Sequence, residues 1–255
     1  MKHMPDVLKK YTYGGVKVAF ITLEKTIKDT VSAHSLDEIC AETTAYAEIV
    51  AAIIVASCKE DGASVSVSIK KEENLFGAVA ENDGRVCGFH EKISPLQNSG
   101  IVLEVTRRLY LRGDYKSIVS ANDVSSAVNE YFRTSLQVEA RFALGKTGNV
   151  YYGLLVEQFP ITCEREEIWR NAANEEIEYL EPIENGNLST ERELMKKYTL
   201  MGVVPIKFGC TCSSASVSEI IKSIPHEELK ATADENGYIE IRCKFCGKTR
   251  KRKVC

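Results

Sequence analysis

The sequence predicts an α+β N-terminal domain (residues 1–162), a Glu-rich helical linker (163–204) and a small cysteine-rich C-terminal domain (205–255). Alternating apolar and polar residues predict several strands in the first part. Ten Glu and three Arg between Glu164 and Glu193 mark the change to the linker, and five of the nine cysteines lie in the last part. With 44% apolar and 27% charged residues, the 255-residue chain is typical of a soluble globular protein and unlike a disordered or collagen-like one.

The first elements are a strand and a long helix. The segment Val16–Leu23 is rich in β-branched and aromatic residues and predicts a strand. Ser35 and Glu38 have the spacing of a capping box, which predicts a helix from Leu36 to about Cys58 that ends before Gly62.

The rest of the first domain predicts mainly strands. Val65, Val67 and Ile69 alternate with serines, as in a half-buried strand, and Asn82-Asp83-Gly84 predicts a hairpin turn. Further predicted elements are strands at Ile101–Leu111, Tyr115–Ser120, Val138–Leu144 and Val150–Val156, and a helix capped by Asp123 that continues to about Thr134.

The Glu-rich linker offers little apolar surface to bury. It is either a solvated helical hairpin packed on the main domain or a conditionally folded segment of low local stability, and composition alone favours the hairpin. Pro182 and Gly186 interrupt it, and Ser189 or Thr190 can begin a short helix toward Met201.

The N-terminal residues show no secretory leader, because the first fifteen lack an apolar stretch. An odd number of cysteines without a leader argues against an extracellular disulfide framework. The most apolar run, Ile49–Cys58, is much shorter than the ~20 residues that a bilayer requires. We therefore expect a cytoplasmic protein with a buried central helix and no membrane partner. The four histidines are dispersed, so no catalytic residues are predicted and we do not expect an enzyme.

The strongest motif is a pair of close cysteine pairs. Cys210 and Cys212 form a CxC pair, and Cys243 and Cys246 form a CxxC pair thirty residues further on. This pattern predicts a tetrahedral four-thiolate site for one Zn²⁺ per chain, with four unlinked thiols as the alternative. Spacing leaves open whether the metal is purely structural. Thiolates beside cations are also oxidation targets, and oxidation would join Cys243 to Cys246 and release the metal.

Charge is distributed unevenly along the chain. Residues 205–255 hold ten basic and six acidic side chains (+4), and the remainder carries −7. The basic tail, Lys248–Lys253, raises an alternative from another class, a zinc-ribbon protein that binds nucleic acid. The acidic body and the scarcity of aromatic residues in the last domain argue against nucleic acid as a partner.

The segment from Phe208 to Lys248, FGCTCSSASVSEIIKSIPHEELKATADENGYIEIRCKFCGK, resembles the redox-switch domain of the 33 kDa heat-shock chaperone family. At lower specificity the resemblance covers most of the chain. Departures include Ser135-Leu136-Gln137, where the family usually reads Ser-Glu-Gln, and Cys87, where it often has arginine.

The resemblance implies a redox-regulated holdase for unfolded client proteins. It implies that the protein is inactive when reduced and zinc-bound, that disulfide formation with zinc release activates it, and that the active form is a homodimer. The linker then becomes a conditionally folded segment. The four cysteines become both zinc ligands and redox sensors, with Cys210–Cys212 and Cys243–Cys246 as the redox-active disulfides.

Overall fold

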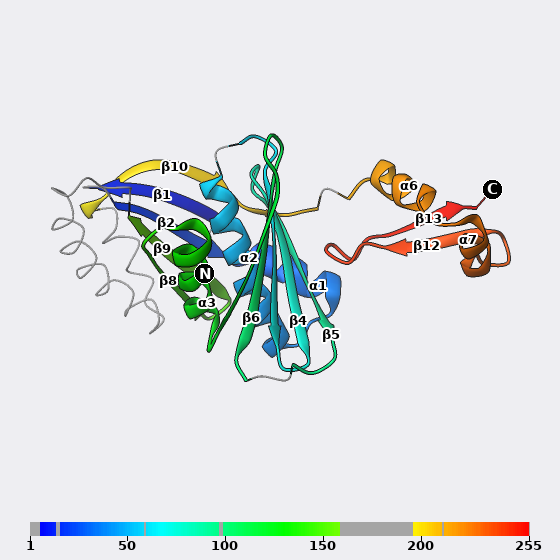
Figure 1. Ribbon diagram of the computed structural model, residues 1–255, viewed down its shortest axis with the longest axis horizontal. Coiled ribbons are helices and arrows are strands. Elements are labelled where there is room, and N and C mark those ends of the chain that lie inside the picture. The colour runs from blue at the N-terminus through cyan, green and yellow to red at the C-terminus, as the bar shows by residue number, and fades with distance from the viewer. Residues whose placement is uncertain are drawn as a thin grey trace.

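The computed structural model describes residues 6–13, 16–58, 60–96, 99–158, 196–210 and 212–254. Two β-sheets with helices between and beside them form the N-terminal part, and a small unit of two helices and a β-hairpin extends to one side (Figure 1).

The smaller sheet has five strands in the order β10-β1-β2-β9-β8, each antiparallel to its neighbour. Its edge strand β10 comes from the far end of the sequence and pairs with β1, with Val7 opposite Pro205. The strands are β1 (Val7–Tyr13), β2 (Val16–Leu23), β8 (Ala140–Thr147), β9 (Val150–Gln158) and β10 (Thr199–Pro205).

The larger sheet has six strands in the order β11-β5-β4-β3-β6-β7. Its strands are antiparallel except that the two-residue strand β11 runs parallel to β5. The strands are β3 (Ser64–Lys71), β4 (Asn74–Glu81), β5 (Arg85–Lys92), β6 (Ile101–Leu109), β7 (Gly113–Ala121) and β11 (Lys207–Phe208).

The central element is α2 (Glu38–Ser57), which packs between the two sheets (Figure 1). Its middle is buried on all sides, and Ile49, Ile53 and Ile54 are at most 1% exposed. In length and composition α2 would suffice to span a membrane, but two thirds of its apolar window is buried inside the protein, as in a core helix. Among the described residues before β10, the other helical elements are α1 (Lys25–His34), α3 (Val124–Tyr131) and a π-helical turn (Phe132–Leu136).

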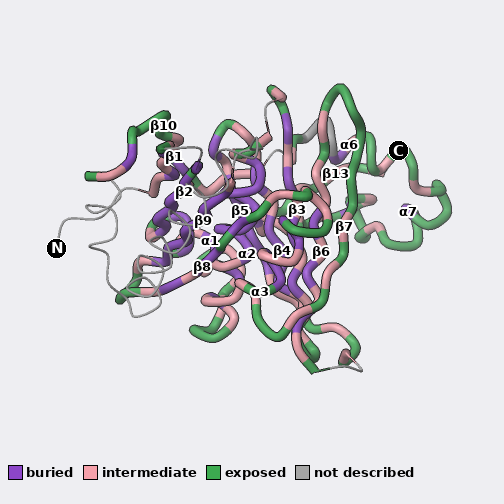
Figure 2. Tube along the Cα trace, turned by 60° about the vertical axis from the view of Figure 1, so that its left-hand side comes forward, coloured by how far each residue is buried: buried purple, intermediate pink, exposed green. Residues whose placement is uncertain are grey.

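The C-terminal unit consists of α6 (Ser214–Lys222), α7 (His226–Thr232), β12 (Tyr238–Arg242) and β13 (Thr249–Lys253). It is far less buried than the sheets, and α7 is mostly exposed (Figure 2). Where burial is described for this unit, its buried apolar side chains are few: Val217, Leu229, Ile239 and Cys246. A core of this size contributes little folding free energy by itself.

Most of the predicted elements are confirmed, including the long helix, whereas the cap of that helix and the end of the helix predicted in the linker are wrong. Asp37, not Ser35, caps α2, since its carboxylate accepts from the Cys40 amide. Ser35 instead ends α1, a helix that the sequence did not predict, in a left-handed conformation. The helix predicted toward Met201 is also wrong at its end, because residues 199–205 form strand β10. The rest of the predicted linker, residues 163–195, lies outside the described residues.

Candidate metal centre

The four motif cysteines come together at one point. Their Sγ atoms all lie within 4.8 Å of one another, which makes them a group that could hold a metal ion. Cys210 faces Cys243 at 3.8 Å between Sγ atoms, and Cys212 faces Cys246 at 3.4 Å. Each of these two contacts joins one member of the CxC pair to one member of the CxxC pair.

Local backbone structure positions each pair. Cys210 follows β11 and Cys212 precedes α6, while Cys243 and Cys246 lie in the turn between β12 and β13. This turn is closed by hydrogen bonds from the Cys243 amide to the Lys248 carbonyl (2.9 Å) and from the Gly247 amide to the Cys243 carbonyl (2.9 Å). Gly247 has a φ of +68°, a conformation that glycine adopts without strain.

The donor set fits zinc. A Zn–S bond of about 2.3 Å places the corners of a regular tetrahedron about 3.8 Å apart, close to the two Sγ separations given above. Cys246 is buried and the other three are half-buried. Four protein thiols leave no coordination position open, as in structural zinc sites. Zn²⁺ with four thiolates carries a net charge of −2, which nearby cations and amide groups must offset.

Basic residues lie near the four cysteines, and some of them bind partners outside the cysteine cluster. Arg250 donates to the Cys212 carbonyl (2.9 Å) and so braces the CxC segment. Lys244 pairs with Glu91 on β5 (2.6 Å) and lies over the Phe89 ring. Arg242 donates to the Ala33 carbonyl (3.2 Å). Of these three basic residues, only Arg250 belongs to the tail Lys248–Lys253.

The cysteine turn docks on the N-terminal part. Phe245 meets Phe89 of β5 edge-on, with ring centroids 5.1 Å apart, and the Phe245 carbonyl lies 2.9 Å from the His34 Nε2. The turn between β12 and β13 points back toward α1 and β5 (Figure 1). The motif predicted the cysteine cluster, but nothing in the sequence pattern indicated this docking surface.

A fifth cysteine, Cys87, touches the cluster and was not predicted as part of it. It lies on β5 and is fully buried. The Cys87 thiol donates a hydrogen bond to Cys210, which lowers the pKa of the Cys210 thiol to about 5 and raises the pKa of Cys87. Burial raises the pKa of Cys212 to about 12 and also raises that of Cys243.

A buried carboxyl group lies near Cys87, and it was also not predicted from the sequence. Glu48 of α2 is 0% exposed and accepts a hydrogen bond from Thr30 Oγ1 (2.5 Å). Burial raises the pKa of Glu48 to about 8, and the hydrogen bonds from Thr30 and the Gly88 amide only partly offset this effect. The only sequence signal was a Glu within an otherwise apolar helix face.

Comparison with known proteins identifies the family. Residues 8–251 match the family model described as Hsp33 protein. The chain belongs to the Hsp33 family. Among curated Hsp33-type relatives, a 33 kDa chaperonin of Shewanella loihica is 25% identical over 94% of this chain and 90% of its own length. One from Pseudomonas syringae pv. tomato is 26% identical over 91% of this chain and 84% of its own length.

The fold comparison agrees with this assignment. A crystal structure of the 33 kDa chaperonin (heat shock protein 33 homolog) from Thermotoga maritima matches with a TM-score of 0.78, covering 99% of this chain and 96% of that one. At 18% identity this likeness shows an Hsp33-like fold. The resemblance inferred from the cysteine motif and the predicted α+β fold class are thereby confirmed.

Proposed function

We propose that this Hsp33-family protein is a redox-regulated holdase that binds unfolding client proteins under oxidative stress. In this proposal Cys210, Cys212, Cys243 and Cys246 hold one Zn²⁺ in the reduced, inactive form. Peroxide-driven pairing of Cys210 with Cys212 and of Cys243 with Cys246 releases the metal, and the active form is a cytoplasmic homodimer. The observation that carries the proposal is the four-thiol cluster, which fits zinc and lies in a unit with little core of its own.

The route from the metal to the rest of the protein runs through residues 199–210. Strand β10 pairs with β1, β11 pairs with β5, and Cys210 follows two residues later. Ile206 in this segment and Tyr198 just before it have buried side chains. Unfolding of the metal unit removes the anchor at one end of this segment, so β11 and then β10 can detach.

Detachment would create apolar surface. Leu200, Met201 and Val203 of β10 are already 46–66% exposed, beside Tyr13 of β1 at 54%. Loss of β10 would add Tyr198 and Ile206 to this surface and uncover β1, whose Leu8 and Tyr11 are at most 2% exposed. Apolar surface of this kind is what an unfolded client recognises, because its own core residues are exposed. Tyr13, Leu200, Met201 and Val203 all lie on the paired strands β1 and β10.

The direct test is peroxide treatment of the reduced, zinc-loaded chain. We expect zinc release, measured with a colorimetric chelator, and suppression of aggregation of a chemically unfolded client, measured by light scattering. The reduced protein is the matched control. Oxidised, metal-free protein that suppresses aggregation no better than the reduced form would overturn the proposal.

A second prediction separates detachment of β10 and β11 from the redox chemistry. Gly84 has a φ of +86°, and a Cβ built on it would lie 2.1 Å from the Pro205 carbonyl oxygen at the end of β10. Gly84→Ala should therefore displace residues 204–207, and we expect client binding by reduced, zinc-loaded protein to increase.

Gly62→Ala is the matched control for this variant. Gly62 has a similar φ of +74°, but a Cβ built there meets nothing within 4 Å. Both substitutions introduce backbone strain of about 1–3 kcal/mol, and only Gly84→Ala pushes on β10. Equal client binding by the two reduced variants would contradict the proposed coupling.

A further inference from the structure

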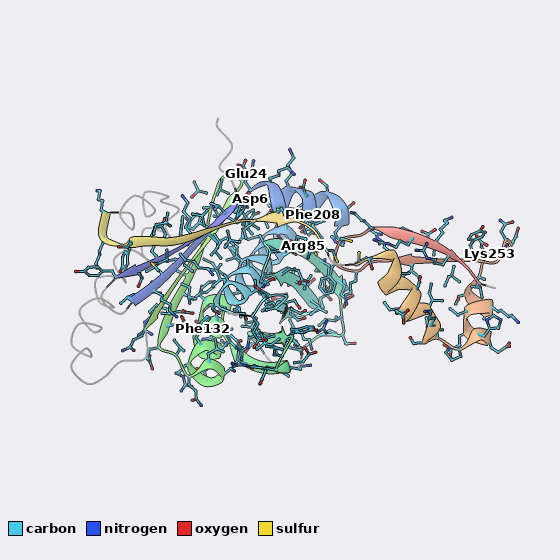
Figure 3. The ribbon with its side chains drawn as sticks, turned by 90° about the horizontal axis from the view of Figure 1, so that it is seen from above. Asp6, Glu24, Arg85, Phe132, Phe208 and Lys253 are labelled. Carbon is cyan, nitrogen blue, oxygen red and sulfur yellow. The ribbon has the colours of Figure 1, made fainter. Side chains whose placement is uncertain are left out.

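One edge of strand β1 is paired with a segment from far along the chain. Strand β1 lies between β2 and β10 in the smaller sheet, and β10 runs antiparallel to it with Lys9 opposite Val203. In Figure 3, β10 lies along β1 near Asp6, and the chain then continues to Phe208. Departure of β10 leaves a row of unpaired backbone groups on β1, and such an edge is a template for another strand.

The backbone hydrogen bonds of this edge involve every second residue of β10. The Ile206 amide donates to the Asp6 carbonyl (2.9 Å). Hydrogen-bonded and non-hydrogen-bonded pairs alternate along an antiparallel ladder, so Pro205 falls in a non-hydrogen-bonded pair and Val204 in a hydrogen-bonded one. Pro205 fits this pattern, because proline has no amide hydrogen to donate. The Val204 amide therefore faces β1, and by the same alternation the Val203 amide faces away from it.

The side chains of β10 alternate in the same way. Val204 packs against the main apolar core and Ile206 is 8% exposed, whereas Val203 is 49% exposed. Val204 and Ile206 line a cavity of about 130 Å³, which Leu8 of β1 and Val86 of β5 also line. The residues whose amides bond to β1 are thus the residues whose side chains face the core. Because β10 leaves this cavity unfilled, the edge can accept apolar side chains of different sizes.

Tyr198, just before β10, is a second anchor at the other end of the edge. It is 5% exposed and belongs to an apolar cluster that includes Tyr11 and Phe20. Its ring also meets that of Tyr13 edge-on, with centroids 6.1 Å apart. The edge of β1 therefore holds an extended segment with an aromatic side chain at one end and aliphatic side chains at the other.

We propose that this edge of β1 binds an extended, alternately apolar segment of an unfolded client by strand addition, in the register that β10 now holds. Unfolded clients contain such segments, because strands with one buried face alternate apolar and polar residues. Main-chain hydrogen bonds supply affinity that is independent of sequence, and pockets for alternate side chains select apolar residues. The inference rests on the proposed function for the step that removes β10 from β1.

A peptide copy of β10 tests the mode of binding. The peptide of residues 197–207, KYTLMGVVPIK, has lysine at both ends and no cysteine. One version is methylated on the Val204 nitrogen, where the methyl group removes the donated hydrogen and meets the Leu8 carbonyl. The matched control is methylated on the Val203 nitrogen, which faces away from β1.

We expect methylation at Val204 to weaken binding by at least about tenfold and methylation at Val203 to change it by less than about twofold. The readout is the fluorescence anisotropy of labelled peptide. Equal effects of the two methyl groups overturn strand addition, because binding to an apolar surface alone does not distinguish the two amides.

The acceptor is reduced, zinc-loaded Val204→Pro protein. Proline at this position removes the amide hydrogen that bonds to β1 and should displace β10 from the edge. Val203→Pro is the matched control, since proline is already tolerated at Pro205, where the amide also faces away from β1. The peptide should bind the Val204→Pro protein and not the Val203→Pro protein. Binding to both folded variants or to neither overturns the inference.

A photo-cross-link locates the bound peptide. A diazirine analogue of leucine in place of Ile206 should label residues that line the cavity. These residues include Leu8, in the tryptic peptide 3–9, and Val86, in the tryptic peptide 86–92. Labels that fall only outside the cavity lining overturn the assignment to this edge.

Oxidised wild-type protein separates the inference from the proposed function. The unmodified peptide and the Val203-methylated peptide should compete with the client in the light-scattering assay, and the Val204-methylated peptide should not. Peptide is used up to about 1 mM, because β10 stays tethered and competes at a millimolar effective concentration.

The outcomes of this competition are distinct. If oxidised protein suppresses aggregation but the two methylated peptides act alike, the inference is overturned and the proposed function stands. If oxidised protein does not suppress aggregation, the proposed function fails, and peptide binding to the Val204→Pro protein decides the inference by itself. If that variant does not fold, competition on the oxidised wild type decides it.

Discussion

Replacing Cys243 by serine is expected to unfold the C-terminal unit without any oxidant. Metal binding supplies roughly 10–16 kcal/mol of apparent folding free energy in small zinc modules. The few buried apolar residues of this unit cannot replace that amount. We expect zinc affinity to fall by more than the roughly 10–100-fold typical of losing an outer-shell partner, as measured by competition with a chelator.

Hydrogen exchange shows how far the unfolding spreads. In the Cys243→Ser protein, amides of β12, β13 and the Lys207–Phe208 strand should lose protection, because the metal centre begins two residues after β11. Strands β3 and β4 should keep theirs, since they are paired on both sides within the larger sheet. Cys58→Ser is the control, as Cys58 lies at the end of α2. Unchanged protection of β11 in the Cys243→Ser protein would contradict the coupling.

Glu48 is expected to make the folded state less stable as pH rises. Its pKa is about 8 in the folded protein and near 4.5 when exposed, so the folded state holds a proton that the unfolded state releases. The stabilisation of the folded state by protonated Glu48 is complete below pH 4.5 and is lost as pH rises toward 8. The free energy of unfolding should fall by about 1.4 kcal/mol per pH unit across that window. The buried site of Glu48 keeps solvent from screening the effect.

Glu48→Gln removes this dependence, because an amide does not titrate and can still accept from Thr30. In urea unfolding, the free energy of unfolding should fall less between pH 5 and pH 7.5 in the variant than in the wild type. At pH 7.5 the variant should be more stable than the wild type by about 2–4 kcal/mol. Glu42→Gln, on the same helix but 42% exposed in its side chain, is the matched control. A variant with the same pH slope as the wild type would show that Glu48 is ionised in the folded protein.

The sequence determined those features that depend on neighbours along the chain. The alternation around Val65, Val67 and Ile69 predicted β3, because side chains of a strand point alternately to the core and outward. Asn82-Asp83-Gly84 predicted the turn between β4 and β5, because Gly84 tolerates its φ of +86°. The two cysteine pairs predicted the four-thiol cluster, because thiolates at that spacing suit one tetrahedral ion.

Local sequence patterns did not decide which residue begins a helix or which segment pairs at the edge of a sheet. Ser35 and Asp37 both precede the long helix and both can cap it. Ser35 instead forms the left-handed end of α1, and Asp37 caps α2. Strand β10 follows a Glu-rich segment and is itself largely exposed, so its sequence carries no buried alternation. It is a strand because β1 offers it an unpaired edge, and that edge is more than 180 residues away in the sequence.

The tertiary structure alone decided what surrounds the metal centre. Cys87 looks like one apolar residue of a strand, and Glu48 looks like an irregularity in an apolar helix. Both lie beside the centre because β11 adds to the edge of β5 and α2 packs beneath that sheet. A short motif can specify the ligands of one metal ion, since binding of the ion supplies the free energy that brings these ligands together. Contacts between distant strands depend on pairing across the whole fold, which no local pattern in this sequence specifies.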